Sequence, residues 1–169
     1  VIERYNSIDE NKPLLIHSDL SLIDSNGKLL EKSHNKLINF QKDLITEYSS
    51  LYYNPVPGCA MSFNSALADK LFHSQYMVMH DWWILLSAIY GNTTVLYIKS
   101  PLVKYRQHSG NVFGYKKVNI LILFIRLLFK IPQYIKNVKK AYKQSKQFKS
   151  QSLIQFFIRL VIHQVRMNM

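Results

Sequence analysis

Two short segments of the chain bring together residue types that can take part in proton transfer or in anion binding. The first, His80-Asp81-Trp82-Trp83, begins an apolar run that Gly91 closes, and it predicts a helix with Asp81 at its head. The helix dipole and the free amides of the first turn stabilise a charged carboxylate there. An ionised carboxylate can accept a proton, whereas the plainer interpretation of Asp81 is a cap of the helix.

The second segment, Tyr105-Arg106-Gln107-His108, lies near the end of an extended stretch. Alternate residues of a strand point to the same side, so Arg106 and His108 present a cation and an imidazole together. This pair suits a diphosphate or a metal ion bound to it, with His108 the weaker candidate as a metal ligand. The alternative is an exposed edge strand with incidental charges.

The elements that must position these segments alternate between strands and helices. Residues 14–24 form an apolar run that ends in polar alternation, and the following Asn26-Gly27 is a strong signal for a tight turn. Further strands are expected at residues 59–63, 95–98 and 101–108, and helices at residues 36–53, 65–72 and 81–90. This alternation predicts the α/β class.

The charge of the chain is divided unevenly along the sequence. All ten carboxylates lie within the first 81 residues, and residues 1–110 balance them with eight Lys and two Arg. Residues 111–169 contain nine Lys, three Arg and no acid, so they carry the whole formal charge of +12. The division predicts a neutral body followed by a basic segment, rather than a uniformly basic protein.

Composition excludes several classes of protein. The chain is 48% hydrophobic and 13% aromatic, which is enough to build a core and excludes intrinsic disorder. The single cysteine, Cys59, excludes an internal disulfide and fits a reducing compartment. Neither GxGxxG nor GxxxxGK[ST] occurs, which excludes a self-contained Rossmann or P-loop nucleotide site. The start at Val1, without an apolar leader, suggests a fragment or a processed chain.

Five motifs, taken in order, resemble those of family 2 glycosyltransferases, and most closely the bacterial rhamnosyltransferase-like enzymes that build surface polysaccharides. They span about residues 12–114 and are Ser18-Asp19-Leu20, Asp24-Ser25-Asn26-Gly27, Pro57-Gly58-Cys59, His80-Asp81-Trp82-Trp83 and Tyr105-Arg106-Gln107-His108-Ser109-Gly110-Asn111. The resemblance implies a GT-A fold with a Rossmann-like mixed sheet. It also implies inversion by direct displacement at the anomeric carbon of a nucleotide sugar.

In that family an acidic DxD motif holds a divalent metal, Mg or Mn, on the donor diphosphate. No Asp-x-Asp occurs in this sequence, so the resemblance covers only the C-terminal, acceptor-side part of such an enzyme, without its nucleotide-binding half. We therefore expect residues 1–114 to form a partial GT-A domain and residues 115–169 to form a basic helical tail.

The resemblance also implies roles for the two chemistry-bearing segments. Asp81 occupies the position of the acid that deprotonates the acceptor hydroxyl, a form of help worth roughly 10² to 10⁴ in rate. Arg106 and His108 lie in the segment that closes over the donor phosphates. For Asp19, at the end of a strand, a structural role is favoured. His17 and Asp19 alternate as metal ligands do, but no third ligand lies nearby, so this pair is discounted as a metal site.

The remaining candidates shape the acceptor side. Gly58 and Cys59 correspond to its loop and strand, although simple loop geometry and a small buried thiol explain them as well. His80 is expected to orient Asp81 or to contact the acceptor, or else to be an ordinary residue at a helix start. Trp82 and Trp83 cannot face one direction on a helix, so we expect one in the core, and the other is a candidate for stacking on a sugar.

The basic tail is expected to lie on a membrane surface. Residues 120–130 are apolar but too few to span a bilayer, residues 133–149 combine an apolar stripe with lysines, and residues 153–162 are again apolar. Apolar helices flanked by lysine describe an interfacial anchor, and near an anionic leaflet each Lys or Arg contributes about 1 kcal/mol. A helix packed on the body with a solvated lysine face is the alternative. Nucleic acid is not favoured as a partner, because no nucleic-acid-binding motif accompanies the charge.

These observations lead to two hypotheses of different classes. In the first, the chain is the acceptor-side part of an inverting glycosyltransferase that moves a sugar from a nucleotide-sugar donor to a saccharide or lipid-linked acceptor. This enzyme would work in cell-surface polysaccharide synthesis, in the cytoplasm and peripherally on the inner face of the cell membrane. In the second, the chain is a non-catalytic module, derived from a truncated enzyme of this kind, that binds a membrane surface or another polyanion.

Overall fold

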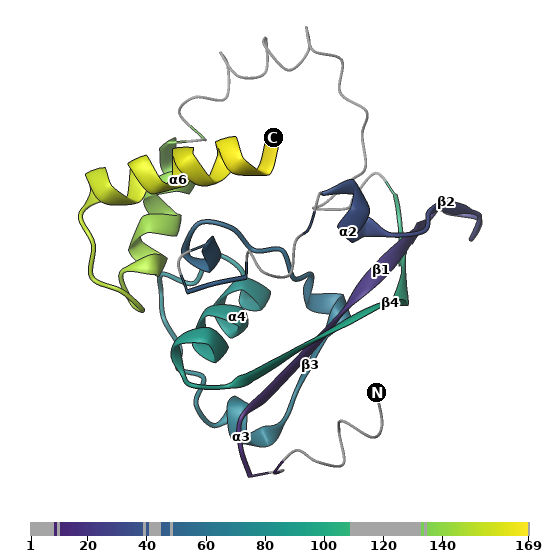
Figure 1. Ribbon diagram of the computed structural model, residues 1–169, viewed down its shortest axis with the longest axis horizontal. Helices are drawn as coiled ribbons and strands as arrows, with labels where there is room; N and C mark the ends of the chain where they lie inside the picture. The colour runs from purple at the N-terminus through teal and green to yellow at the C-terminus, as the bar shows by residue number, and fades with distance from the viewer. Residues whose placement is uncertain are drawn as a thin grey trace, which may run out of the picture.

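The computed structural model describes residues 9, 11–38, 40, 45–47, 49–108, 133 and 135–168. Within these residues the chain is an α/β protein built on a mixed four-stranded sheet (Figure 1). Helix α4 (His80–Tyr90) lies between the sheet and the C-terminal helices, so the described chain forms three layers. The α/β class predicted from the sequence is confirmed.

Strand β1 (Leu14–Ile23) is the centre of the sheet. It pairs in parallel with β4 (Thr94–Arg106) along one side, and antiparallel with β2 (Leu29–Glu31) and β3 (Met61–Phe63) along the other. Nine of the ten residues of β1 are buried, because strands on both sides and helices above leave little of it in contact with water. The strand predicted from the long apolar run is therefore confirmed.

Strand β4 is one long element where the sequence predicted two. Its register with β1 shifts between Ser18, which pairs with Ile98, and Asp19, which pairs with Pro101. A proline has no N–H to give to the ladder, and the bulge accommodates it without ending the strand. The ladder then continues to Ile23 opposite Arg106, so the end of β4 lies beside the end of β1.

The turn between β1 and β2 follows the sequence prediction. Gly27 has φ +87°, a conformation that favours glycine, and the Asp24 carboxylate accepts the N–H groups of Asn26 and Lys28 at 2.9 and 2.8 Å. β2 returns antiparallel, with Leu22 opposite Glu31.

The other helices are short, apart from α4 and the C-terminal ones. The predicted helix at residues 81–90 is confirmed as α4, which Gly91 closes. The expected strand at residues 59–63 begins as a 3-10 turn and becomes β3 only at Met61. Residues 135–145 are helical, whereas the predicted apolar run at 120–130 lies outside the described residues. The remaining elements are α2 (His34–Leu37), η2 (Ser49–Leu51), η3 (Gly58–Ala60), α3 (Ser65–Ala68) and α6 (Leu153–Asn168).

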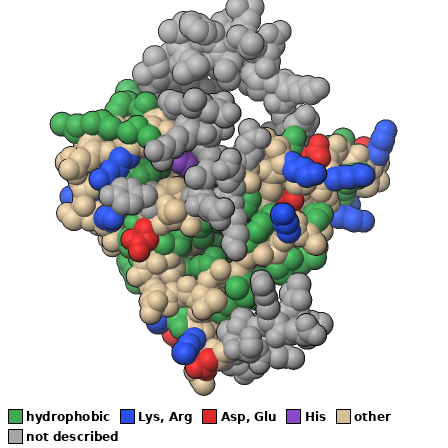
Figure 2. Space-filling view, viewed as in Figure 1, with side chains coloured by type: hydrophobic (Ala, Val, Ile, Leu, Met, Phe, Trp, Pro, Cys, Tyr) green, Lys and Arg blue, Asp and Glu red, His purple; other side chains and the backbone are tan. Residues whose placement is uncertain are grey.

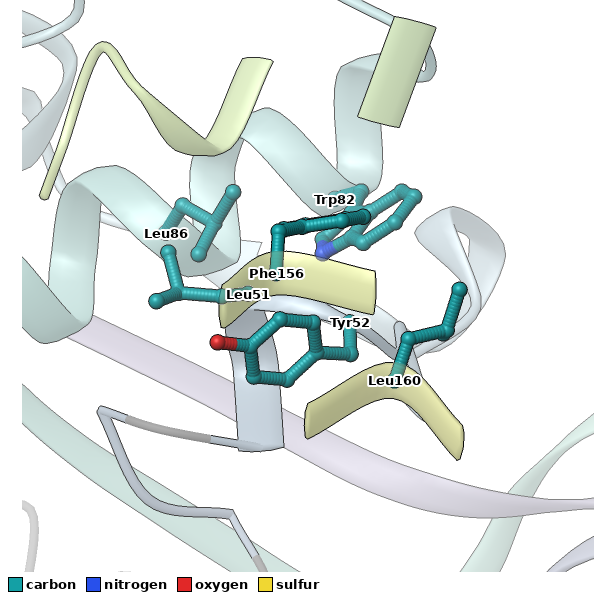
Figure 3. Close-up of a cluster of buried hydrophobic side chains, with 6 residues drawn as sticks. All are labelled: Leu51, Tyr52, Trp82, Leu86, Phe156 and Leu160. Carbon is teal, nitrogen blue, oxygen red and sulfur yellow. The ribbon is translucent and has the colours of Figure 1, made fainter. Parts of the chain in front are cut away.

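The C-terminal helices share a hydrophobic core with the α/β body. Phe156 and Leu160 of α6 are buried against Leu51 and Tyr52, beside Trp82 of α4 (Figure 3). Partly buried Val138, Ala141, Tyr142 and Phe148 of the preceding segment pack on the same cluster. The boundary predicted between residues 114 and 115 therefore separates two stretches of chain that fold around one core. The tail was interpreted either as a membrane anchor or as a helix packed on the body, and residues 135–149 pack on the body. No helix among the described residues is both long and apolar enough to cross a bilayer.

Asp19 joins β1 to helix α2. Its Oδ1 accepts the backbone N–H groups of Leu20 and Asn35 at 2.7 and 3.0 Å, and its Oδ2 accepts the Ser33 hydroxyl at 2.5 Å. Ser33 in turn caps α2 through the Lys36 N–H. These partners give Asp19 a structural role, as the sequence favoured.

His34, the first residue of α2, makes the fold sensitive to acid. Burial lowers the pKa of His34 from its ordinary value of 6.5, and the Asp19 carboxylate opposes this only in part. The unfolded chain therefore takes up a proton at a higher pH than the folded chain does. Stability is lost as pH falls from 6.5 towards the lower folded-state pKa.

We expect His34→Gln to remove this component of the pH dependence. In chemical denaturation at a series of pH values, the wild type should lose free energy of unfolding relative to His34→Gln as pH falls below 6.5. The exposed His73 provides the control, and His73→Gln should follow the wild-type curve. Parallel curves for the wild type and His34→Gln would contradict the assignment.

Candidate functional site

The candidate site lies where loop η3 meets the first turn of α4. The Asp81 side chain is 5% exposed, and both of its oxygens accept backbone N–H groups: Oδ2 from Gly58 at 3.0 Å and Oδ1 from Trp82 at 2.7 Å. The residue before the helix is Met79, which offers no side-chain cap. Asp81 therefore satisfies a first-turn amide from inside the helix, where the dipole favours negative charge, rather than from the cap position itself.

Gly58 is required by the close approach of η3 to α4. A Cβ atom at this position would lie 2.8 Å from His80 Nε2 and 3.2 Å from Asp81 Cβ, both closer than side chains normally tolerate. The absence of a side chain thus brings the Gly58 N–H to the carboxylate. The structure therefore brings together Gly58, His80 and Asp81, three of the residues singled out from the sequence.

Cys59 is the fourth member of this group. Its side chain is exposed, and its thiol lies within electrostatic range of Asp81. Partial desolvation and the negative charge of Asp81 raise the pKa of the Cys59 thiol, so the thiol is protonated at neutral pH. A protonated thiol is a poor nucleophile, and the exposed position differs from the small buried thiol considered from the sequence. Cys59 borders the carboxylate without competing with it for a proton.

Trp82 and Trp83 are both core residues, so neither takes the candidate role of stacking on a sugar. Trp82 is 8% exposed and donates Nε1–H to the Ser50 carbonyl at 2.6 Å. Trp83 is 1% exposed and donates to the Phe72 carbonyl at 3.0 Å, with its ring against Phe148. Their burial has a simple cause: α4 is covered by the sheet and by the C-terminal helices, so both directions in which the indoles point are buried.

Arg106 and His108 lie at the end of β4. Arg106 Nη1 donates to the carbonyl groups of Asp24 and Ser25 at 3.2 and 2.8 Å, in the turn after β1. His108 follows the strand and is exposed. Arg106 therefore contacts the turn between β1 and β2, and its role toward a diphosphate remains a prediction.

A metal site is not formed by the part of the chain that the structure describes. No three His, Cys, Asp or Glu side chains there are grouped so that they could hold a metal ion. His108 as a metal ligand therefore also remains a prediction.

The hydrogen bond between Gly58 and Asp81 in the candidate site was not predicted from the sequence. The two residues are separated by 23 positions, and no periodicity or spacing pairs the amide of one with the carboxylate of the other. The available signal was the glycine itself, because a glycine after Pro57 marks a place where backbone can approach closely.

Comparisons of the chain with protein-family models, with curated proteins and with solved structures find no match. The class of the protein is therefore defined by its fold and its candidate site. It is a mixed α/β protein with a buried carboxylate held at a helix N-terminus, bordered by a histidine and an exposed cysteine.

Proposed function

We propose that this chain provides the acceptor side of an inverting glycosyltransferase, with Asp81 as the general base. One observation carries the proposal: a buried carboxylate lies at the head of α4, in contact with the η3 amide and bordered by the surface residues His80 and Cys59. The resemblance of the five ordered motifs to family 2 glycosyltransferases supports the same assignment.

In the proposed reaction, Asp81 accepts one proton. A carboxylate has about four lone-pair positions, and the two backbone amides use two of them. A remaining position accepts the proton of the acceptor hydroxyl as its oxygen attacks the anomeric carbon. The new C–O bond forms while the bond from that carbon to the donor diphosphate breaks, and its electron pair leaves with the nucleoside diphosphate. The two amides hold the carboxylate in one orientation, which a general base requires.

His80 and Cys59 border this carboxylate and are proposed to contact the acceptor. His80 is exposed next to Asp81, and the Cys59 thiol, whose pKa is raised by partial burial and by the charge of Asp81, is protonated at neutral pH and does not act as a base beside the carboxylate. The described residues offer no ligand set that fits the Mg or Mn of the family, and the sequence contains no Asp-x-Asp. The proposal therefore takes no step through a metal ion.

The test is donor-dependent sugar transfer by the protein expressed from the complete reading frame that encodes this chain. A panel of nucleotide sugars is offered together with saccharide and lipid-linked acceptors, and release of nucleoside diphosphate is followed with and without acceptor. We expect acceptor-dependent release and a product whose anomeric configuration, read by NMR, is inverted. Retention of configuration, or the absence of turnover with every donor, would contradict the proposal.

The alternative, a non-catalytic module that binds a membrane surface or a polyanion, is favoured by a separate observation. Residues 82–169 contain no carboxylate, and the lysines at 136, 139, 140, 143 and 146 are exposed. Membrane binding by itself is compatible with either proposal, so the same preparation is assayed for both activities, and acceptor-dependent transfer would exclude the non-catalytic module.

A further inference from the structure

Helix α6 carries apolar side chains on two sides. Phe156 and Leu160 face the core and are buried, whereas Ile154, Ile158 and Ile162 are 73%, 53% and 47% exposed. A spacing of four residues aligns these isoleucines along one side of the helix. Exposed Leu153, Phe157 and Val161 adjoin them. We call these six residues the outer face of α6.

The outer face of α6 is a contiguous apolar surface. Single exposed apolar residues are normal on a protein surface, but a row of six on one helix marks a place of interaction. Figure 2 shows the hydrophobic side chains along the upper left margin of the molecule, where α6 lies, with Lys and Arg side chains close to them.

The helix that precedes α6 supplies the neighbouring charge. Its apolar residues Val138, Ala141 and Tyr142 are used in the core shared with the body. Its lysines are left on the surface, and its own stretch of the sequence contains no Asp or Glu. Exposed lysines on this helix are Lys136, Lys139, Lys140 and Lys143.

We propose that the outer face of α6 inserts into the interface of an anionic phospholipid bilayer, with these lysines at the level of the headgroups. An amphipathic helix of this kind lies in the membrane plane with its apolar side at the boundary of headgroups and acyl chains. The lysines are attracted electrostatically to a negatively charged leaflet and not to a neutral one, so they strengthen binding only to anionic membranes.

A second copy of the chain fits the surface less well. Pairing two outer faces would bring the exposed lysines of both copies together, and their like charges would repel each other. An anionic leaflet, by contrast, accommodates the apolar row and the lysines at once. The inference does not depend on the proposed transferase activity, because vesicle binding requires neither donor nor acceptor.

The experiment is co-sedimentation of the whole chain with vesicles of phosphatidylcholine alone and of equal parts phosphatidylcholine and phosphatidylglycerol. The wild type should bind the anionic vesicles strongly and the neutral ones weakly. The triple variant Ile154→Ser, Ile158→Ser, Ile162→Ser should bind the anionic vesicles at least about tenfold more weakly. Its control is Leu29→Ser, Leu30→Ser, Leu102→Ser, which removes three aliphatic side chains exposed elsewhere and should bind as the wild type does.

The charge is tested in the same way. Replacing Lys136, Lys139, Lys140 and Lys143 by Gln should weaken binding to anionic vesicles by nearly three orders of magnitude, at about 1 kcal/mol for each lysine, and leave binding to neutral vesicles unchanged. The control makes the same change at four exposed lysines of the body, namely Lys28, Lys32, Lys99 and Lys104, with a smaller effect expected.

A third measurement keeps the test valid if the triple variant unfolds. Ile158→Cys in a Cys59→Ser background carries an environment-sensitive fluorophore, which should shift to the blue with anionic vesicles, whereas the same label at Leu102→Cys should not. Equal loss of binding in both triple variants, or no binding by the wild type, would overturn the inference. So would a dimer in analytical ultracentrifugation that the isoleucine variant converts to a monomer, because the face would then be a contact between copies.

Discussion

Asp81→Asn is expected to lower the rate of sugar transfer by roughly two to four orders of magnitude while donor binding persists. An amide at this position cannot take the proton of the acceptor hydroxyl. The rate is measured as nucleoside diphosphate release at saturating donor and acceptor, and donor affinity by titration. Retained turnover in the variant would remove Asp81 from the mechanism.

Asp81→Asn is also expected to lower the stability of the fold, so the experiment needs a control for unfolding. Both oxygens of Asp81 accept backbone N–H groups, from Gly58 and Trp82, whereas asparagine has only one acceptor oxygen. Its NH₂ group would face one of these donors, which costs about 1 to 3 kcal/mol of stability. A loss of activity through unfolding would therefore resemble a loss of the base.

Asp19→Asn is the matched control. Asp19 is also a buried carboxylate, and both of its oxygens accept hydrogen bonds. Its partners position helix α2 and lie outside the candidate site. We expect Asp19→Asn to lower the free energy of unfolding and to leave transfer per folded molecule nearly unchanged. If both variants lose transfer only in proportion to their unfolded fraction, Asp81 is structural. If Asp81→Asn alone also loses the acidic limb of the pH–rate profile, it is the base.

Phe156→Ala is expected to lower the free energy of unfolding by about 3 to 5 kcal/mol. Phe156 is fully buried, and its ring lies 4.9 Å from that of Tyr52 and 5.6 Å from that of Tyr142. The substitution leaves a cavity between α6 and the α/β body, so both the lost burial and the cavity contribute. Denaturant unfolding measures the change.

The adjacent residue gives a control with the same side chain. Phe157 lies on the outer face of α6 and is 50% exposed, so Phe157→Ala should change stability by no more than about 0.5 kcal/mol. A small and equal effect of both substitutions would mean that α6 does not pack on the body in solution. It would then restore the independent tail that the charge distribution predicted.

Much of the fold was readable from the sequence because it rests on local signals. Hydrophobic runs are set by which side chains avoid water, and they located β1 and α4 within a residue or two. Gly27 and Gly91 were correctly read as a turn and a helix end, since backbone geometry at such points depends on few neighbours. The sequence also singled out Gly58, Cys59, His80 and Asp81, which the structure brings together, whereas their roles remain predictions.

Only the tertiary structure decided what those residues touch. The pairing of the Gly58 amide with Asp81, the burial of both tryptophans and the contacts of Arg106 with the β1–β2 turn all join segments distant in sequence. The apolar stripes of the tail look alike in the sequence. In the structure, the stripe on residues 135–148 and one side of α6 pack in the core, whereas the other apolar side of α6 is exposed. Periodicity predicts that a helix has an apolar face. Whether that face packs on the body or is exposed to solvent depends on packing between elements, which no local sequence pattern encodes.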